Sequence, residues 1–101
     1  MQESEFLKRV CARAQSLGWR YYHPTRAVYR GRYWLTPHIG QSGFPDLVLV
    51  RGHRLIFAEL KGNCGRLKPA QDEWLSALRA CGVEVYLWRP RDWPTIEQIL
   101  E

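Results

Sequence analysis

Residues 43–61 read GFPDLVLVRGHRLIFAELK and contain the most clearly patterned segment of the chain. The apolar run from Asp46 to Val50 predicts a buried strand, Gly52 lies in a predicted tight turn, and Leu55 to Lys61 predict a second strand antiparallel to the first. Together these strands predict a hairpin. A hairpin places the start of its first strand beside the end of its second strand.

Side-chain alternation along the second strand indicates which residues share a face. Glu59 and Lys61 point to one face of the sheet, whereas their neighbours Ala58 and Leu60 point to the other. Asp46 begins the partner strand, so we expect Asp46, Glu59 and Lys61 to converge at one end of the sheet.

The chain before this hairpin predicts a helix, a strand and an irregular arm. Apolar residues at helical spacing precede Gly18, which is placed to end the helix; they are Phe6, Leu7, Val10, Ala14 and Leu17. Residues 19–23 predict a strand. Residues 24–45 are rich in Pro and Gly, which breaks any long element, and residues 27–35 are suited either to a short hairpin or to an irregular arm.

The chain after the hairpin predicts a helix, a strand and a last helix. Pro69 is suited to the first turn of a helix that ends at Gly82; its predicted inward residues are Trp74, Leu75, Leu78 and Cys81. Residues 83–88 predict a strand, and Asp92 is suited to cap a short final helix. The order α-β-arm-β-β-α-β-α predicts an α/β fold with a mixed central β-sheet flanked by helices.

Composition predicts one basic domain over residues 1–101. Lys and Arg number 15 against 10 Asp and Glu, a formal net charge of +5, which favours binding to nucleic acid or to an anionic membrane surface. No apolar run approaches the ~20 residues that span a bilayer, and no secretory segment is present at the N-terminus. We therefore expect a soluble, cytoplasmic protein without a membrane partner.

The predicted convergence of two carboxylates and an ammonium group indicates a metal site. Neighbouring carboxylates raise each other's pKa, and a divalent cation removes that conflict. Mg²⁺ prefers oxygen ligands, so Asp46, Glu59, the backbone carbonyl of Leu60 and a substrate phosphate would complete its coordination, and Mn²⁺ is expected to substitute. The cation would activate water, and Lys61 would orient that water or stabilise the transition state. No organic cofactor is expected.

The same residues resemble a known nuclease core. Gly43-Phe-Pro-Asp46 followed by Phe57-Ala-Glu-Leu-Lys61 is similar to the PD-(D/E)xK nucleases, and most similar to their VRR-NUC branch. The resemblance implies a restriction-endonuclease-like core. It extends through Gly18-Trp19, Gly65-Arg66-Leu67, Gln71 with Trp74, Trp88-Arg-Pro90 and Asp92-Trp93.

The resemblance also implies an acid on the first helix and a glutamine on the second. Glu3 extends the inward stripe of its helix, whereas Glu5 aligns with Arg9 on the polar side. Gln71 likewise precedes an inward face and would hold a metal-bound water or Lys61. The alternatives are that Glu3 is a dipole-favoured acid at a helix N-terminus and that Gln71 is a solvated first-turn residue. The implied catalytic set is Asp46, Glu59, Lys61, Gln71 and Glu3, with Glu3 joining the metal ligands.

Other charged and titratable residues complete the expected site. Basic residues flank it and are suited to gripping a phosphate backbone, although any one can be a solvated charge; they are Arg26, Arg30, Arg32, Arg66 and Lys68. Three histidines lie in or beside predicted turns without a partner at ligand spacing, which favours loop residues over metal ligands; they are His23, His38 and His53.

The predicted function is metal-dependent hydrolysis of phosphodiester bonds in DNA, leaving a 5′-phosphate and a 3′-hydroxyl. The resemblance implies a homodimer that acts on branched DNA, such as flaps or four-way (Holliday) junctions. Two alternatives remain: an RNA-cleaving or restriction-type nuclease of the same fold, and a non-catalytic nucleic-acid-binding subunit. The presence of Asp46, Glu59 and Lys61 argues against the non-catalytic subunit, because a binding module gains nothing from carboxylates beside an anionic ligand.

Overall fold

A mixed four-stranded sheet forms the centre of the computed structural model, which describes residues 1–24, 28–30, 33–35 and 39–101, with the backbone alone at 28–30 and 33–35. The strands lie in the order β1-β4-β5-β6, with bounds Arg20–Tyr22, Leu47–Arg51, Arg54–Leu60 and Glu84–Trp88. β1, β4 and β5 pair antiparallel, whereas β6 pairs parallel to β5. The predicted α/β fold with a mixed sheet is confirmed.

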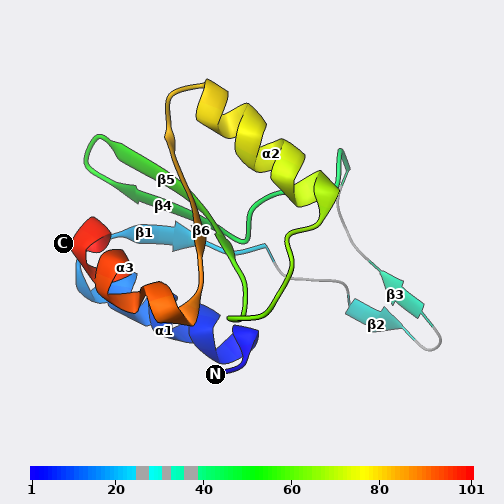
Figure 1. Ribbon diagram of the computed structural model, residues 1–101, viewed down its shortest axis with the longest axis horizontal. Helices are drawn as coiled ribbons and strands as arrows, with labels where there is room; N and C mark the ends of the chain where they lie inside the picture. Colours follow the sequence, from blue (N-terminus) through cyan, green and yellow to red (C-terminus); the bar gives the residue numbers. More distant parts are fainter. Residues whose placement is uncertain (25–27, 31–32, 36–38) are drawn as a thin grey trace.

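Helices cover both faces of this sheet. α1 (Glu3–Ser16) and α3 (Trp93–Leu100) lie on one face, and α2 (Pro69–Ala80), which connects β5 to β6, lies on the other (Figure 1). The core beneath α1 and α3 is closely packed, and the stripe predicted for the first helix contributes Phe6, Val10 and Ala14 to it. The sheet contributes Ile56 to this core, together with Ala58 and Leu60, which alternation assigned to this face.

The β4–β5 hairpin sets the geometry of the site. Its register pairs Leu47 with Ala58 and Arg51 with Arg54, so the turn consists of Gly52 and His53. β4 begins one residue later than predicted, which leaves Asp46 immediately before the strand. Continued by one residue, the register places Asp46 opposite Glu59.

The arm contains a short hairpin, one of the two alternatives that the sequence left open. β2 (Val28–Arg30) and β3 (Tyr33–Leu35) pair antiparallel as a separate two-stranded sheet. Arg26, Arg32, His38 and the side chain of Arg30 lie outside the described residues, so their predicted roles stay predictions. At the end of the arm, the Phe44 ring meets the rings of Phe57 and Trp74 edge to face, at centroid distances of 5.9 and 5.1 Å.

Two details of the helices differ from the sequence prediction. Cys81 was expected to face inward, but it is exposed, because α2 ends at Ala80 and Cys81 is already its C-cap. Asp92 was expected to cap α3. A short 3₁₀ helix, η1 (Pro90–Asp92), precedes α3, and the Asp92 carboxylate caps that turn by accepting a hydrogen bond from the Arg89 backbone N–H at 2.9 Å. Among the described residues, no helix has the length and apolar character needed to cross a membrane.

Candidate active site

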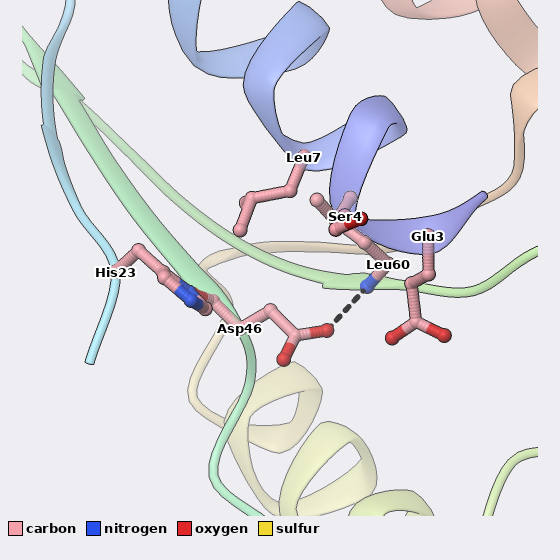
Figure 2. Close-up of a pocket in the computed structure, with 6 residues that line it drawn as sticks. All are labelled: Glu3, Ser4, Leu7, His23, Asp46 and Leu60. Carbon is pink, nitrogen blue, oxygen red and sulfur yellow. Dashed lines mark hydrogen bonds between the residues drawn. The ribbon is translucent and has the colours of Figure 1, made fainter. Parts of the chain in front are cut away.

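Asp46 is held between two strands at the end of the sheet. Its carboxylate Oδ2 accepts a hydrogen bond from the Leu60 backbone N–H at 2.9 Å, and its backbone carbonyl lies 2.6 Å from His23 Nδ1. Asp46 lines a cavity of about 390 Å³, and Figure 2 shows it between His23 and Glu3 in this cavity. Ser4, Leu7 and Leu60 complete its lining.

Glu59 is a buried carboxylate on the opposite face of β5 from the α1–α3 core. Its side chain is fully buried, and Oε2 lies 3.0 Å from Gln71 Nε2 and 3.5 Å from Lys61 Nζ. Burial raises the pKa of Glu59, the charge of Asp46 raises it further and the Lys61 ammonium opposes both effects, so that the resulting pKa is about 7. Its other oxygen, Oε1, is buried without a hydrogen-bond partner among the described residues.

Lys61 follows β5 and is 7% exposed, which is rare for lysine and requires a partner. Glu59 provides that partner. The connection after Lys61 is fixed by Arg89, whose Nη1 donates to the carbonyl oxygens of Gly62 and Gly65 at 2.7 Å each. Gly65 lies close to the Lys61 stem, because a Cβ added at Gly65 would come into van der Waals contact with Lys61 Cβ and Cδ, at 3.5 Å from each.

Gln71 turns inward from the first turn of α2, as the spacing predicted. Its Nε2 donates to Glu59, and its Oε1 accepts a hydrogen bond from the Lys68 backbone N–H at 2.9 Å. The structure therefore places its amide on Glu59, whereas the sequence suggested Lys61 or a water. Both the nitrogen and the oxygen of the Gln71 amide make hydrogen bonds, so the amide is itself held in place and fixes the orientation of Glu59.

Glu3 lies in the first turn of α1 and lines the same cavity as Asp46 (Figure 2). It faces the cavity, as the helix stripe predicted, whereas Glu5 is exposed. Within the part of the chain that the structure describes, no three His, Cys, Asp or Glu side chains form a group able to hold a metal ion. The predicted acids are thus arranged as a close pair, Asp46 with Glu59, and a third acid in the cavity wall.

The Asp46–Glu59 pair fits a divalent cation. Two neighbouring carboxylates repel each other, and a buried oxygen without a hydrogen bond is costly. A hard cation would give Glu59 Oε1 a partner and neutralise both charges, and these oxygen donors are the kind that Mg²⁺ prefers. The arrangement can therefore hold a cation beside a lysine that is already in place.

Comparison with known proteins agrees with this geometry. The VRR-NUC domain matches residues 32–92, more than half of the chain. The chain belongs to the VRR-NUC family. Membership identifies the protein as a nuclease and confirms the resemblance seen in the sequence. Among curated proteins, none matches this VRR-NUC chain.

A solved structure shares the fold of this VRR-NUC nuclease. It is Hjc from Archaeoglobus fulgidus, described as a Holliday junction resolvase from an archaeal hyperthermophile. The match has a TM-score of 0.53 and 20% sequence identity, and it covers 87% of this chain and 69% of Hjc. At this identity the likeness shows the fold alone, and it confirms the restriction-endonuclease-like core.

The predicted basic residues that the structure describes with side chains lie on the connection between β5 and α2. Arg66 and Lys68 are both exposed there, so their charges are open to a ligand. They follow Lys61 along the connection that Arg89 fixes. Their part in nucleic-acid binding stays a prediction.

His23 contacts this VRR-NUC site in the described part of the chain, and the sequence did not identify it as a site residue. It was interpreted as a loop histidine, yet it contacts Asp46 and lines the cavity. His53, interpreted in the same way, is exposed in the β4–β5 turn. The contact of His23 depends on the pairing of β1 with β4, and no local spacing in the sequence reports that pairing.

Proposed function

We propose that this nuclease is a Mg²⁺-dependent endonuclease of the PD-(D/E)xK type that hydrolyses phosphodiester bonds in DNA. The observation that carries the proposal is the buried Glu59 carboxylate, whose Oε1 has no hydrogen-bond partner among the described residues while Asp46 and Lys61 lie beside it. A carboxylate so placed is destabilising unless a ligand uses it. The same observation disfavours a non-catalytic binding subunit.

Asp46 and Glu59 would hold the Mg²⁺ ion, with the Leu60 carbonyl as a further oxygen donor, and Mn²⁺ would substitute. When bound, the ion makes a water molecule more acidic and neutralises charge on the phosphate. Glu3, which lines the same cavity as Asp46, would join these metal ligands.

The protein's own residues hold the proposed catalytic groups in position. The Leu60 N–H fixes one carboxylate oxygen of Asp46, and the Gln71 amide fixes Oε2 of Glu59. The Lys61 ammonium, held by Glu59, supplies positive charge and a hydrogen bond where negative charge develops on the phosphate. Water would attack phosphorus and lose a proton while the bond between phosphorus and the 3′ oxygen breaks. The 3′ oxygen would take up a proton, so that the products carry a 5′-phosphate and a 3′-hydroxyl.

We further propose branched DNA as the substrate and a homodimer as the active form. The support is the fold that the chain shares with Hjc, a protein described as a Holliday junction resolvase, together with the net charge of +5. A four-way junction is symmetric, so two identical sites related by a two-fold axis would meet equivalent strands. Residues 1–101 would form a single nuclease domain in each subunit.

The test compares substrates and metals. Purified protein is incubated with linear, flapped and four-way-junction DNA and with RNA of the same sequence, in Mg²⁺, Mn²⁺ or chelator. We expect flap or junction cleavage with either metal and none with chelator. Preferential cleavage of RNA, or equal cleavage of linear DNA, would support the related nuclease types. No cleavage of any substrate would support a binding subunit.

Substitutions test the proposed residues within the same assay. Asp46→Ala, Glu59→Ala and Lys61→Ala are each expected to abolish cleavage and to leave DNA binding in chelator largely intact. Glu97→Ala is the matched control, because Glu97 pairs with Arg13 at 3.2 Å between α3 and α1 and has no proposed role in the site. A variant of the first three that cleaves normally would remove its residue from the mechanism.

A further inference from the structure

We propose that His23 is a positioning residue, which holds the Asp46 backbone so that the Asp46 carboxylate can bind the metal. The inference rests on the proposed function. The direct observation is the short contact of 2.6 Å between His23 Nδ1 and the Asp46 carbonyl oxygen. A carbonyl oxygen only accepts hydrogen bonds, so Nδ1 must be the donor, which fixes the protonated nitrogen of the ring.

The backbone explains why a side chain is needed at this point. β1 pairs with β4 in a register that joins Arg20 to Val50 and Tyr22 to Val48. Continued past the end of both strands, this register places Pro24 opposite Asp46. Proline has no backbone N–H, so it cannot donate to the Asp46 carbonyl as a ladder residue would. The His23 ring supplies that donor.

Asp46 is then fixed from both neighbouring strands and from its own chain. His23, next to β1, holds its carbonyl, and the Leu60 N–H, on β5, holds its carboxylate at 2.9 Å. Pro45, directly before it, is fully buried. These contacts leave the Asp46 peptide little freedom to rotate.

Fixing Asp46 matters because of its neighbour. The continued register of the β4–β5 hairpin places Asp46 opposite Glu59, and two carboxylates at such close range repel each other. A peptide held only by its carboxylate could turn away from Glu59 and relieve that repulsion, and the two ligands would then separate. His23 opposes this movement without contacting the carboxylate. Its ring also lines the cavity that Asp46 and Glu3 share (Figure 2).

The experiment compares three substitutions of His23 with a control. In His23→Asn the amide nitrogen takes the position of Nδ1, so the hydrogen bond can be kept. In His23→Gln the amide extends toward the position of Nε2, and in His23→Ala no donor remains. His53→Ala removes an exposed histidine from the turn of the same sheet. Measurements are the Mn²⁺ dissociation constant of the DNA-free protein by calorimetry, kcat and KM on junction DNA, and the melting temperature.

We expect His23→Ala and His23→Gln to weaken Mn²⁺ binding and to lower kcat by about 10-fold, as is usual for residues that orient a metal ligand, with little change in KM. His23→Asn and His53→Ala should stay close to wild type. If His23→Ala does not fold, the Asn and Gln variants still test the donor position.

Three outcomes would contradict the inference. Wild-type Mn²⁺ affinity in the Ala or Gln variant would overturn it, and so would an Asn variant as impaired as the Gln variant. In both cases a wild-type protein that binds Mn²⁺ and cleaves DNA would leave the proposed function standing. A wild-type protein that neither binds Mn²⁺ nor cleaves any substrate would overturn the proposed function and this inference together.

Discussion

Replacing Gly43 by alanine is expected to destabilise the fold and to disturb the active site from a distance. Gly43 has a φ of +98° and lies directly against the first turn of α2. A Cβ at this position would be 2.6 Å from the backbone carbon and oxygen of Ala70 and 2.9 Å from the backbone nitrogen of Gln71. These are backbone atoms, so a side-chain rotation cannot relieve the clash.

The size of the effect follows from two terms. A positive φ costs alanine about 1–2 kcal/mol. Carbon atoms in contact need roughly 3.5 Å, so the first turn of α2 must move by about 0.9 Å, and overpacking of this kind costs about 1–3 kcal/mol more. Gln71 lies in that turn, and its hydrogen bond to Glu59 is 3.0 Å long. A shift of this size away from the sheet would break it, and we expect kcat to fall about 10-fold.

The assay is urea unfolding together with cleavage kinetics, and Gly40→Ala is the matched control. Gly40 also has a positive φ, of +123°, but an added Cβ would meet nothing within 4 Å. The control therefore carries the backbone strain without the clash. If Gly43→Ala and Gly40→Ala lose the same free energy of unfolding, or if Gly43→Ala keeps full activity, the reasoning from the clash is refuted.

Three further predictions concern pH, the metal and the loop beside Lys61. Without metal, the free energy of unfolding should fall by about 3 kcal/mol as pH rises from 4.5 to above 7. The reason is that a pKa of about 7 makes Glu59 bind its proton more tightly in the folded protein than in the unfolded chain. In urea unfolding, Glu59→Gln should lack this decrease with pH. At pH 8, Mg²⁺ at about 100 times its Kd should stabilise wild type by about 2.7 kcal/mol and Glu59→Ala by nothing measurable in thermal unfolding. Arg89→Ala should loosen the loop after Lys61, which would speed amide hydrogen exchange at residues 62–65 and lower kcat about 10-fold. Arg79 is exposed on α2, so Arg79→Ala should change neither quantity. Unchanged hydrogen exchange in Arg89→Ala would show that Arg89 does not hold the loop.

The local patterns of the sequence predicted the part of the site that lies on the hairpin. Asp46, Glu59 and Lys61 meet because strand alternation and a two-residue turn set their positions, and both are short-range features. The inward direction of Gln71 followed from helical spacing in the same way. The sequence therefore predicted where these four residues lie in the fold, while their catalytic roles stay predictions.

The features that the sequence missed depend on contacts between distant segments. The contact of His23 requires β1 to pair with β4 across the whole arm, and nothing in the local spacing fixes that register. The complete burial of Glu59 depends on α2 covering its face of the sheet. Cys81 was placed inward because periodicity gives the face of a helix and does not show where that helix ends.

The β4–β5 hairpin has a consequence for how the protein folds. Two residues join its strands, whereas the arm separates β1 from β4 and α2 separates β5 from β6. We therefore expect the hairpin to be the first pairing of the sheet to form. It brings Asp46 and Glu59 together while both are still solvated, and their repulsion is then small. Glu59 is buried beside Gln71 of α2 in the folded protein, so it would lose its water when α2 docks. The electrostatic barrier therefore belongs to this late step, and refolding should slow with rising pH and speed up when Mg²⁺ is added.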